Sequence, residues 1–336
     1  MSVTDGQRDM PGAAEAGAIC IVAGLPGPLL HWTCNVLHSA MALTHPNIEH
    51  VPLDDDSVHR LHDTIDRATG RLFVGNTVNE AWQAEIRRGR VPSVLVLEDA
   101  DAAIAHFQDA GQPLDEAIRN ACVIAMSLGD LVDSARVMTV TRSNFDGARN
   151  VVAELRRHAG FAAGDSDSAS AHPAPEPVTP PLPRTDDMVA VLEEVLRPSC
   201  LYGLTGQRVP ITWPRACLMW GDRPGHPVPR IIDLTGPARI LTYGPYVPLP
   251  PGAWRMNVTL AISRTACGTP LSLKLQGRSA LGRFAFTADQ PGLYKASFPV
   301  RVRSPREVLE CYLETERGAI EGCIGVDRIA FEPEDS

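Results

Sequence analysis

Apolar and polar positions follow a helix-and-strand alternation in the first half of the chain. Ile19, Ile21 and Val22 have the density of a buried strand. After a short segment containing Gly and Pro, apolar residues recur at a spacing of three to four, as on one face of a helix. These are Leu29, Trp32, Val36, Ala40 and Leu43. A strand, a tight loop and a helix in this order can present helix amides to a phosphate group.

The alternation continues to residue 160. Further strands are predicted at 48–53, 71–74, 93–97 and 136–141, and helices at 57–68, 80–88, 102–109, 114–131 and 147–159. Ser57 is expected to cap the helix at 57–68. Strands that alternate with helices predict a parallel sheet with helices on both faces, the α/β class.

Beyond residue 230 the hydrophobic period becomes two, as in strands with one buried face. Alternating apolar positions predict strands at 254–262 and 294–302. Turn signals stand at Pro224-Gly225, at the Pro250-Pro251-Gly252 run and at Pro291-Gly292. Short strands with such punctuation and without helices predict a β-sandwich.

These patterns divide the chain into five segments. A flexible N-terminus is predicted at 1–17, an α/β domain at 18–160, a linker at 161–185, a connecting helix and loop at 186–230, and a sandwich at 231–336. The linker is rich in Ala, Ser, Asp and Pro, so we expect it to be flexible at first and stiffer toward its prolines. The connecting helix is predicted at 186–196.

Composition indicates a globular chain whose first half is acidic. Hydrophobic residues make up 44% and charged residues 21% of the chain. Residues 1–185 carry 14 Arg and Lys against 24 Asp and Glu, which makes a poor surface for nucleic acid or a polyanionic cofactor. Lys274 and Lys295 are the only lysines, so the first half has no P-loop lysine.

Targeting and redox signals favour a cytoplasmic protein. No run of eighteen apolar residues predicts a membrane span, and the N-terminus lacks the basic region of a signal peptide. The eight cysteines form no CxxC pair and no metal-ligand spacing, which favours reduced core thiols over a disulfide or zinc framework. Abundant alanine, with arginine used in place of lysine, is typical of a GC-rich bacterial genome.

The first loop carries a family resemblance. Gly24-Leu25-Pro26, followed at an unbroken spacing by Trp32, resembles the opening motif of the sulfotransferases, which holds the 5′-phosphosulfate of the donor PAPS. The resemblance implies a P-loop-type fold, but the ligand-bearing positions differ. Gly27 stands at the basic position and Pro28 at the hydroxyl position, while Leu29, Leu30 and His31 replace the inner glycine and two further hydroxyl residues. Proline removes an amide donor, and a leucine Cβ prevents close backbone approach.

The resemblance extends over residues 18–160, and within this range further ligand-bearing positions differ from the family pattern. In the stretch 94–107, Glu98 stands where the family has an arginine that holds the 3′-phosphate, and His106 stands at its serine position. Around Thr77, where the resemblance implies a catalytic histidine, Asn76 and Val78 cannot take a proton at neutral pH. A charge-assisted hydrogen bond contributes about 1.5–3 kcal/mol. Losing about 6 kcal/mol weakens binding about ten-thousandfold, so we expect neither PAPS as cofactor nor a catalytic residue.

Two other constellations have functional and structural interpretations. His59 and His62 lie near three aspartates at 54–56 and could suggest a metal, but an acidic helix start stabilised by the helix dipole is favoured, and no metal is expected. Glu98 and Asp99 could form an acid/base pair at the carboxyl edge of the sheet, where α/β folds bind ligands. Without a visible partner group, the structural interpretation is favoured for them too.

The predicted all-β sandwich resembles the jelly-roll-like carbohydrate-binding modules appended to bacterial glycosyltransferases and other polysaccharide enzymes. The stretches 238–260 and 324–333 carry this resemblance. Sugar binding needs an aromatic face for stacking and planar polar groups for paired hydroxyls. The candidates are Arg239, Tyr243, Tyr246, Trp254 and Arg255. Trp254 alternates with the inward-facing set and is expected in the core, whereas the two tyrosines flank a Gly-Pro kink and are open to either role.

Together these features predict a non-catalytic, cytoplasmic bacterial protein of cell-surface or exopolysaccharide production. Its expected partner is a polysaccharide or an enzyme of polysaccharide synthesis. The alternatives are a PAPS-dependent carbohydrate sulfotransferase with an atypical site and a purely structural scaffold. The sequence leaves open the glycan, the protein partner, whether the chain forms a homo-oligomer, and whether the Gly24 loop binds another anion through its remaining amides.

Overall fold

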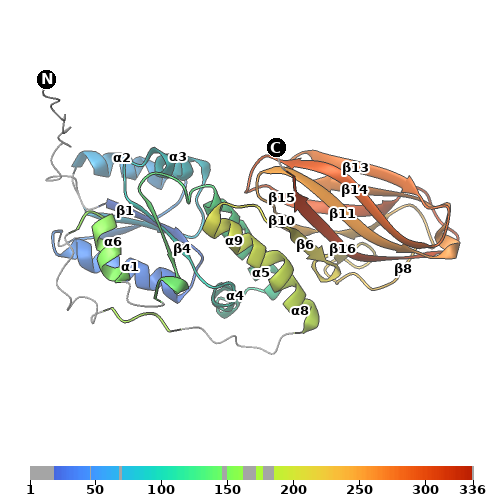
Figure 1. The fold of residues 1–336 in the computed structure, drawn as a ribbon, viewed down its shortest axis with the longest axis horizontal. Helices are drawn as coiled ribbons and strands as arrows, with labels where there is room; N and C mark the ends of the chain where they lie inside the picture. Colours follow the sequence, from blue (N-terminus) through green and yellow to red (C-terminus); the bar gives the residue numbers. More distant parts are fainter. Residues whose placement is uncertain are drawn as a thin grey trace, which may run out of the picture.

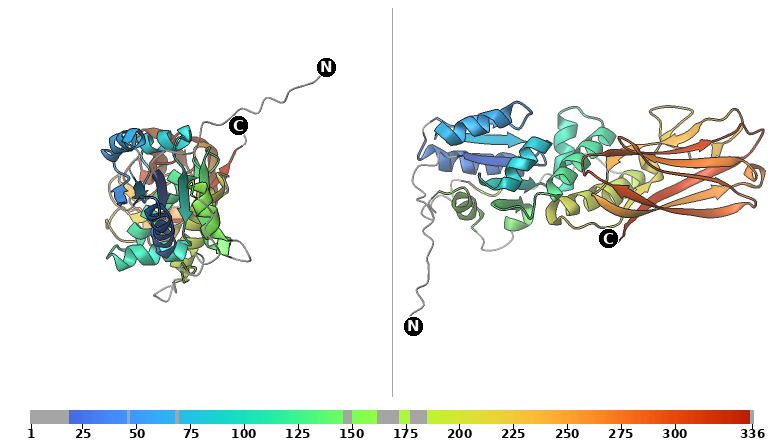
Figure 2. Two further views of the ribbon diagram at one scale, coloured as in Figure 1. Left: turned by 90° about the vertical axis from the view of Figure 1, so that its left-hand side faces the viewer. Right: turned by 90° about the horizontal axis from the view of Figure 1, so that it is seen from above.

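The computed structural model describes residues 19–45, 47–67, 70–145, 150–161, 172–176 and 185–334. They form two parts that lie end to end, an α/β part and an all-β part (Figures 1 and 2). The N-terminus predicted to be flexible lies outside the described residues, and so does most of the predicted linker.

Five parallel strands form the sheet of the α/β part, in the order β2-β3-β1-β4-β5. They are β1 (Ile19–Gly24), β2 (Glu49–Pro52), β3 (Arg71–Gly75), β4 (Ser93–Leu97) and β5 (Val137–Thr141). The helices are α1 (Pro28–Ala42), α2 (Ser57–Arg67), α3 (Glu80–Arg88), α4 (Ala100–Asp109), α5 (Leu114–Gly129) and α6 (Val151–His158), with a 3-10 turn at Arg142–Phe145.

Alternate side chains of the central strand face two separate apolar layers. Cys20 and Val22 of β1 pack in a cluster with residues of α1 and α6. Ile21 and Ala23 pack on the other face with residues of α3 and α5. Successive strand side chains point to opposite faces, so a strand covered by helices on both sides is apolar throughout. The predicted α/β class is confirmed.

Two local predictions for this part are wrong. Leu43 does not belong to the buried face of α1, because the helix ends at Ala42 and Leu43 is 73% exposed. Ser57 does not cap α2 from outside but is its first residue, and its amide donates to Asp54 Oδ1 at 2.7 Å. Asp54 therefore supplies the acceptor at this helix start.

The connecting helix continues nine residues past its predicted end at 196. It comprises α8 (Asp186–Val191), a π-helical turn at Leu192–Leu196 and α9 (Arg197–Thr205). Pro198, two residues past the predicted end, has no amide hydrogen to donate within a helix. The wide turn just before it places Pro198 in the first turn of α9, where no intrahelical donor is needed. Within the described ranges, no helix is both long enough and apolar enough to cross a membrane.

The all-β part is a sandwich of two antiparallel sheets, and the predicted class is confirmed. One sheet has the order β13-β12-β15-β9-β7 with β10 added on β15, and the other has β14-β11-β16-β6 with β8 added on β16. The strands are β6 (Ile211–Pro214), β7 (Met219–Trp220), β8 (Ile232–Asp233), β9 (Ile240–Tyr243), β10 (Pro245–Pro248), β11 (Gly252–Ile262), β12 (Pro270–Gln276), β13 (Ala280–Thr287), β14 (Gly292–Val302), β15 (Val308–Thr315) and β16 (Cys323–Pro333). Two of them, β6 and β7, precede residue 231.

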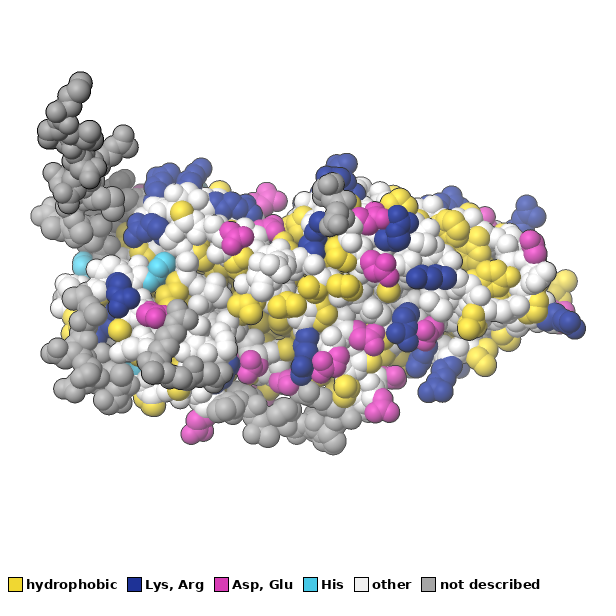
Figure 3. Space-filling view, viewed as in Figure 1, with side chains coloured by type: hydrophobic (Ala, Val, Ile, Leu, Met, Phe, Trp, Pro, Cys, Tyr) yellow, Lys and Arg dark blue, Asp and Glu magenta, His cyan; other side chains and the backbone are white. Residues whose placement is uncertain are grey.

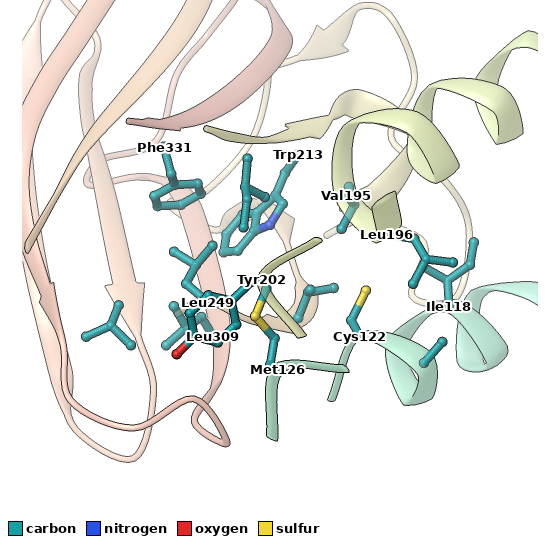
Figure 4. Close-up of a cluster of buried hydrophobic side chains, with 14 of the residues drawn as sticks. Ile118, Cys122, Met126, Val195, Leu196, Tyr202, Trp213, Leu249, Leu309 and Phe331 are labelled. Atoms are coloured by element: carbon teal, nitrogen blue, oxygen red, sulfur yellow. The ribbon is translucent and has the colours of Figure 1, made fainter. Parts of the chain in front are cut away.

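The two parts share a continuous hydrophobic core (Figure 4). Met126 of α5, Leu196 of the π turn and Tyr202 of α9 belong to the same buried cluster as Trp213 of β6 and Phe331 of β16. Helices α5 and α9 approach closely at two glycines. A Cβ on Gly129 would lie 2.7 Å from the Tyr202 carbonyl oxygen, and one on Gly203 would lie 2.7 Å from the Ala125 carbonyl oxygen. The connecting helix is therefore closely packed on α5 of the α/β part.

Candidate functional site

The loop between β1 and α1 is shaped by two glycines. A Cβ on Gly24 would collide with Val96 of the neighbouring strand β4. Gly27 has a φ of 149°, and a Cβ there would lie 2.9 Å from Oε2 of Glu98. Pro28 opens α1 and has no amide hydrogen to offer. The backbone of the loop thus folds closely around the side chain of Glu98.

Glu98 fills the space in front of the first turn of α1. It follows the last residue of β4, and its side chain is 0% exposed. Its Oε2 accepts the backbone amide of Leu29 at 2.7 Å, and its Oε1 accepts Nε of Arg142 at 2.8 Å. A buried carboxylate needs such partners, and the positive end of a helix dipole stabilises it further.

Arg142 is the residue of this site that the sequence did not reveal. It begins the 3-10 turn after β5, and its side chain is 15% exposed. Because β4 and β5 are neighbouring parallel strands, residues that follow them meet at the same carboxyl edge of the sheet. In the sequence, the signal for the pair of Glu98 and Arg142 is that a charged residue directly follows each of these two strands.

This arrangement does not fit the 5′-phosphosulfate of PAPS. A phosphate group at a helix N-terminus would need the amides of the first turn, and the carboxylate of Glu98 already accepts the Leu29 amide. Arg142, the cation beside this helix start, is also already paired with Glu98, so neither the Leu29 amide nor Nε of Arg142 is available to an incoming anion. No step of sulfuryl transfer can be derived through these residues.

The other predicted loop residues lie around the same helix start. His31 and His106 come together with ring centroids 6.0 Å apart, edge to face. Trp32 is 8% exposed and packs edge to face on Phe145 at 4.8 Å. The structure thus places Gly24, Pro26, Gly27, Pro28, His31, Trp32, Glu98 and His106 around the loop between β1 and α1 and the first turn of α1. Near β3, Val78 is fully buried, so this position offers no proton acceptor.

A cavity of about 560 Å³ lies beside Glu98 at the carboxyl edge of the sheet. Its polar lining includes Asp99 and Arg197, and its apolar lining includes Leu201 and Leu204 of α9. Figure 3 shows exposed hydrophobic side chains near the middle of the molecule, between the α/β part and the sandwich. Burial, and then the charge of Glu98, raise the pKa of Asp99. Glu98 is held by Leu29 and Arg142, which favours a structural role over the acid/base alternative.

The histidine and aspartate cluster near α2 is engaged in local contacts. Asp54 accepts the amide of Ser57, Asp55 accepts a hydrogen bond from Asn79, and His62 lies 3.1 Å from Glu85 Oε1. Among the described residues, no group of three His, Cys, Asp or Glu side chains is arranged to hold a metal ion. These contacts support the interpretation of 54–62 as an acidic helix start.

On the sandwich, two of the predicted aromatic residues lie together. The ring centroids of Tyr243 and Tyr246 are 6.3 Å apart, edge to face. The hydroxyls of Tyr246 and Tyr312 each donate to a different oxygen of Glu310. Burial, and then the bond to Glu310, raise the pKa of Tyr312 to about 12 and raise the pKa of Tyr246 as well. All four side chains are half-buried and form a set that we call the tyrosine cluster.

The remaining three sandwich candidates lie elsewhere. Trp254 is fully buried and donates Nε1 to the Pro250 carbonyl at 2.8 Å, so its ring is not a binding face. Arg239 donates hydrogen bonds to Asp222 and to the backbone carbonyl of Asp233. It lies just before β9, four residues or about 13 Å along the strand from Tyr243. Arg255 pairs with Glu334 on the opposite sheet.

Sequence reasoning missed Glu310 and Tyr312, although strand β15 contains a signal. Leu309, Cys311 and Leu313 are buried, while Glu310 and Tyr312 alternate with them. This period of two identifies a strand with one face turned away from the core. Its pairing with β10, which brings Glu310 to Tyr246, is a non-local contact that the period does not reveal.

No family model matches this sequence, and no curated protein matches it. Among solved structures, mouse sulfotransferase SULT7A1 complexed with PAP is 11% identical with a TM-score of 0.36, covering 46% of this chain and 61% of that protein. The module CBM6cm-2 of Cellvibrio mixtus lichenase 5A, in complex with cellotriose, is 12% identical with a TM-score of 0.24, covering 37% of this chain and 100% of the module.

A third structure is TmCBM61 in complex with β-1,4-galactotriose. It is 13% identical with a TM-score of 0.23, covering 30% of this chain and 67% of that module. The chain is thus similar to a sulfotransferase in one part and to carbohydrate-binding modules in the other. At these identities the function has to be argued from the side chains themselves.

Proposed function

We propose that this chain is a non-catalytic recognition protein of bacterial cell-surface or exopolysaccharide production. Its α/β part serves as a scaffold that takes no PAPS, and its sandwich recognises a glycan or an enzyme that makes one. One observation supports the proposal that the chain is not an enzyme. The carboxylate of Glu98 accepts hydrogen bonds from the Leu29 amide and from Arg142. The site thereby holds an anion of its own.

The tyrosine cluster supports glycan recognition. Tyr243 and Tyr246 offer half-buried aromatic rings, and Glu310 fixes the hydroxyls of Tyr246 and Tyr312. Aromatic rings with polar groups in fixed positions suit a sugar, which has apolar C–H faces and hydroxyl edges. Because Glu310 is a carboxylate, we expect a neutral glycan rather than an anionic one.

Truncating the rings tests this assignment. We expect Tyr243→Ala and Tyr246→Ala each to weaken retention on a polysaccharide by at least about tenfold, as for the truncation of a central tyrosine of an interface. The measurement is native affinity electrophoresis of the full chain in gels that contain hydroxyethylcellulose, β-1,4-galactan or barley β-glucan. Circular dichroism checks that each variant is folded.

Tyr294→Ala is the matched control, because Tyr294 is a half-buried tyrosine of β14 on the opposite sheet. Its retention should equal that of the unmodified chain. If none of the three polysaccharides slows the migration of the unmodified chain, recognition of these glycan classes is rejected. That result would favour the alternative that the chain is a purely structural scaffold. If the chain is retained and the two tyrosine variants are retained equally, the glycan site lies elsewhere on the sandwich.

A further inference from the structure

A short proline-containing segment lies across the α/β part. Residues 172–176 have the sequence His-Pro-Ala-Pro-Glu. Nε1 of Trp32 donates to the carbonyl of His172 at 3.4 Å, and Nη1 of Arg142 donates to the carbonyl of Pro175 at 2.5 Å. Each of these hydrogen bonds joins residues that are more than 30 positions apart in the sequence. Together they hold the segment beside Glu98.

The segment contacts the domain with a period of three. His172 and Pro175 are half-buried, whereas Pro173, Ala174 and Glu176 are exposed. A polyproline II helix has three residues per turn and a rise of about 3.1 Å per residue, so one face recurs every third residue, about 9 Å apart. Both accepting carbonyls belong to this face, which is the pattern expected of such a helix.

Each of the two donors is also held by a contact outside residues 172–176. Trp32 belongs to α1 and packs on Phe145, and Arg142 is held by Glu98 through its Nε. Nη1 of Arg142 therefore remains free to donate outward. Grooves that bind proline-rich segments use aromatic rings and fixed donors in this way, because a polyproline helix has unpaired carbonyls and little conformational entropy to lose.

We propose that Trp32 and Arg142 form a docking surface for a polyproline-type segment, and that residues 172–176 of this chain occupy it in cis. The surface then accepts the same sequence in trans when the tethered copy is removed. This inference does not depend on glycan recognition, since it uses only residues of the α/β part and residues 172–176.

The test uses the full chain with His172→Gly, Pro173→Ser and Pro175→Ser, which keeps the backbone carbonyls but removes the proline rings that favour the polyproline helix, so that the cis segment loses its preformed shape. A peptide with His-Pro-Ala-Pro-Glu between Gly-Ser flanks is titrated into the 15N-labelled variant, and the indole N–H signal of Trp32 is followed by NMR. We expect this signal to differ between the variant and the unmodified chain, and to return toward its original position as peptide binds. The unmodified chain should bind the peptide more weakly than the variant, because the tethered segment competes at an effective concentration of about 1 mM; for a dissociation constant of about 0.1 mM the weakening is about tenfold.

Two controls keep the result specific. A peptide with both prolines replaced by alanine should leave the signal unmoved, because the polyproline helix is lost. Trp32→Phe in the variant identifies the indole signal and should weaken peptide binding at other signals by removing the donor. An unchanged Trp32 signal in the folded variant, or equal binding of the alanine peptide, would overturn the proposal.

Discussion

Replacing Glu98 with alanine is expected to lower the free energy of unfolding by about 3–5 kcal/mol. The substitution leaves the guanidinium of Arg142, which is 15% exposed, without its carboxylate and the Leu29 amide without its acceptor. Removing one member of a buried ion pair costs this much because the remaining charge stays desolvated. Urea unfolding followed by circular dichroism measures the change.

Two comparisons separate this effect from simple cavity formation. Glu98→Gln keeps the size and one oxygen acceptor, so we expect it to be destabilised by less than Glu98→Ala. Inorganic phosphate at constant ionic strength should raise the midpoint of Glu98→Ala more than that of the unmodified chain, because the alanine variant exposes the Leu29 amide and Arg142 to an anion. Equal phosphate responses would contradict the placement of Glu98 at the anion position.

Trp213→Ala is expected to destabilise both parts of the chain together, by about 3–5 kcal/mol. Trp213 is fully buried, packs on Phe331 at 4.5 Å, and lies in the core shared with α5 and α9. Since the core is continuous, we expect one unfolding transition with coincident midpoints for helical and tyrosine or tryptophan signals. The measurement is urea unfolding followed in parallel by far-ultraviolet circular dichroism and by fluorescence.

The matched control is Trp220→Ala, a tryptophan of β7 that is half-buried beside Arg223. We expect Trp220→Ala to lower the free energy of unfolding by less than Trp213→Ala does, because it removes less buried apolar surface. If Trp213→Ala instead splits the unfolding into two transitions, or shifts only one of the two signals, the shared core does not couple the parts.

Elements with strong local periodicity could be predicted from the sequence almost to the residue. The helix at 80–88 and the strand at 93–97 match α3 and β4, because their apolar spacing and flanking signals agree. The strand predicted at 254–262 lies within β11, and Trp254, which the alternation places in the core, is fully buried. Local pattern was sufficient both for β4, which is buried throughout, and for α3, which buries one face.

The contacts that give the site its character are non-local, so the pattern could not reveal them. Glu98 and Leu29 are 69 residues apart, and Tyr246 and Glu310 are 64 apart. The sequence marked Glu98 as a charge reversal at a phosphate contact, but only the fold shows its carboxylate at the start of α1. The continuation of the helix through Pro198 was missed because a π turn has no simple sequence signature.

We expect that the α/β part does not bind the nucleotide of PAPS. Calorimetric titration of the full chain with 3′-phosphoadenosine 5′-phosphate at low salt tests this expectation most directly. With the carboxylate of Glu98 on the Leu29 amide, we predict no heat of binding, corresponding to a dissociation constant above about 1 mM. Micromolar binding by the folded chain would contradict this expectation and would favour a sulfotransferase with an atypical site.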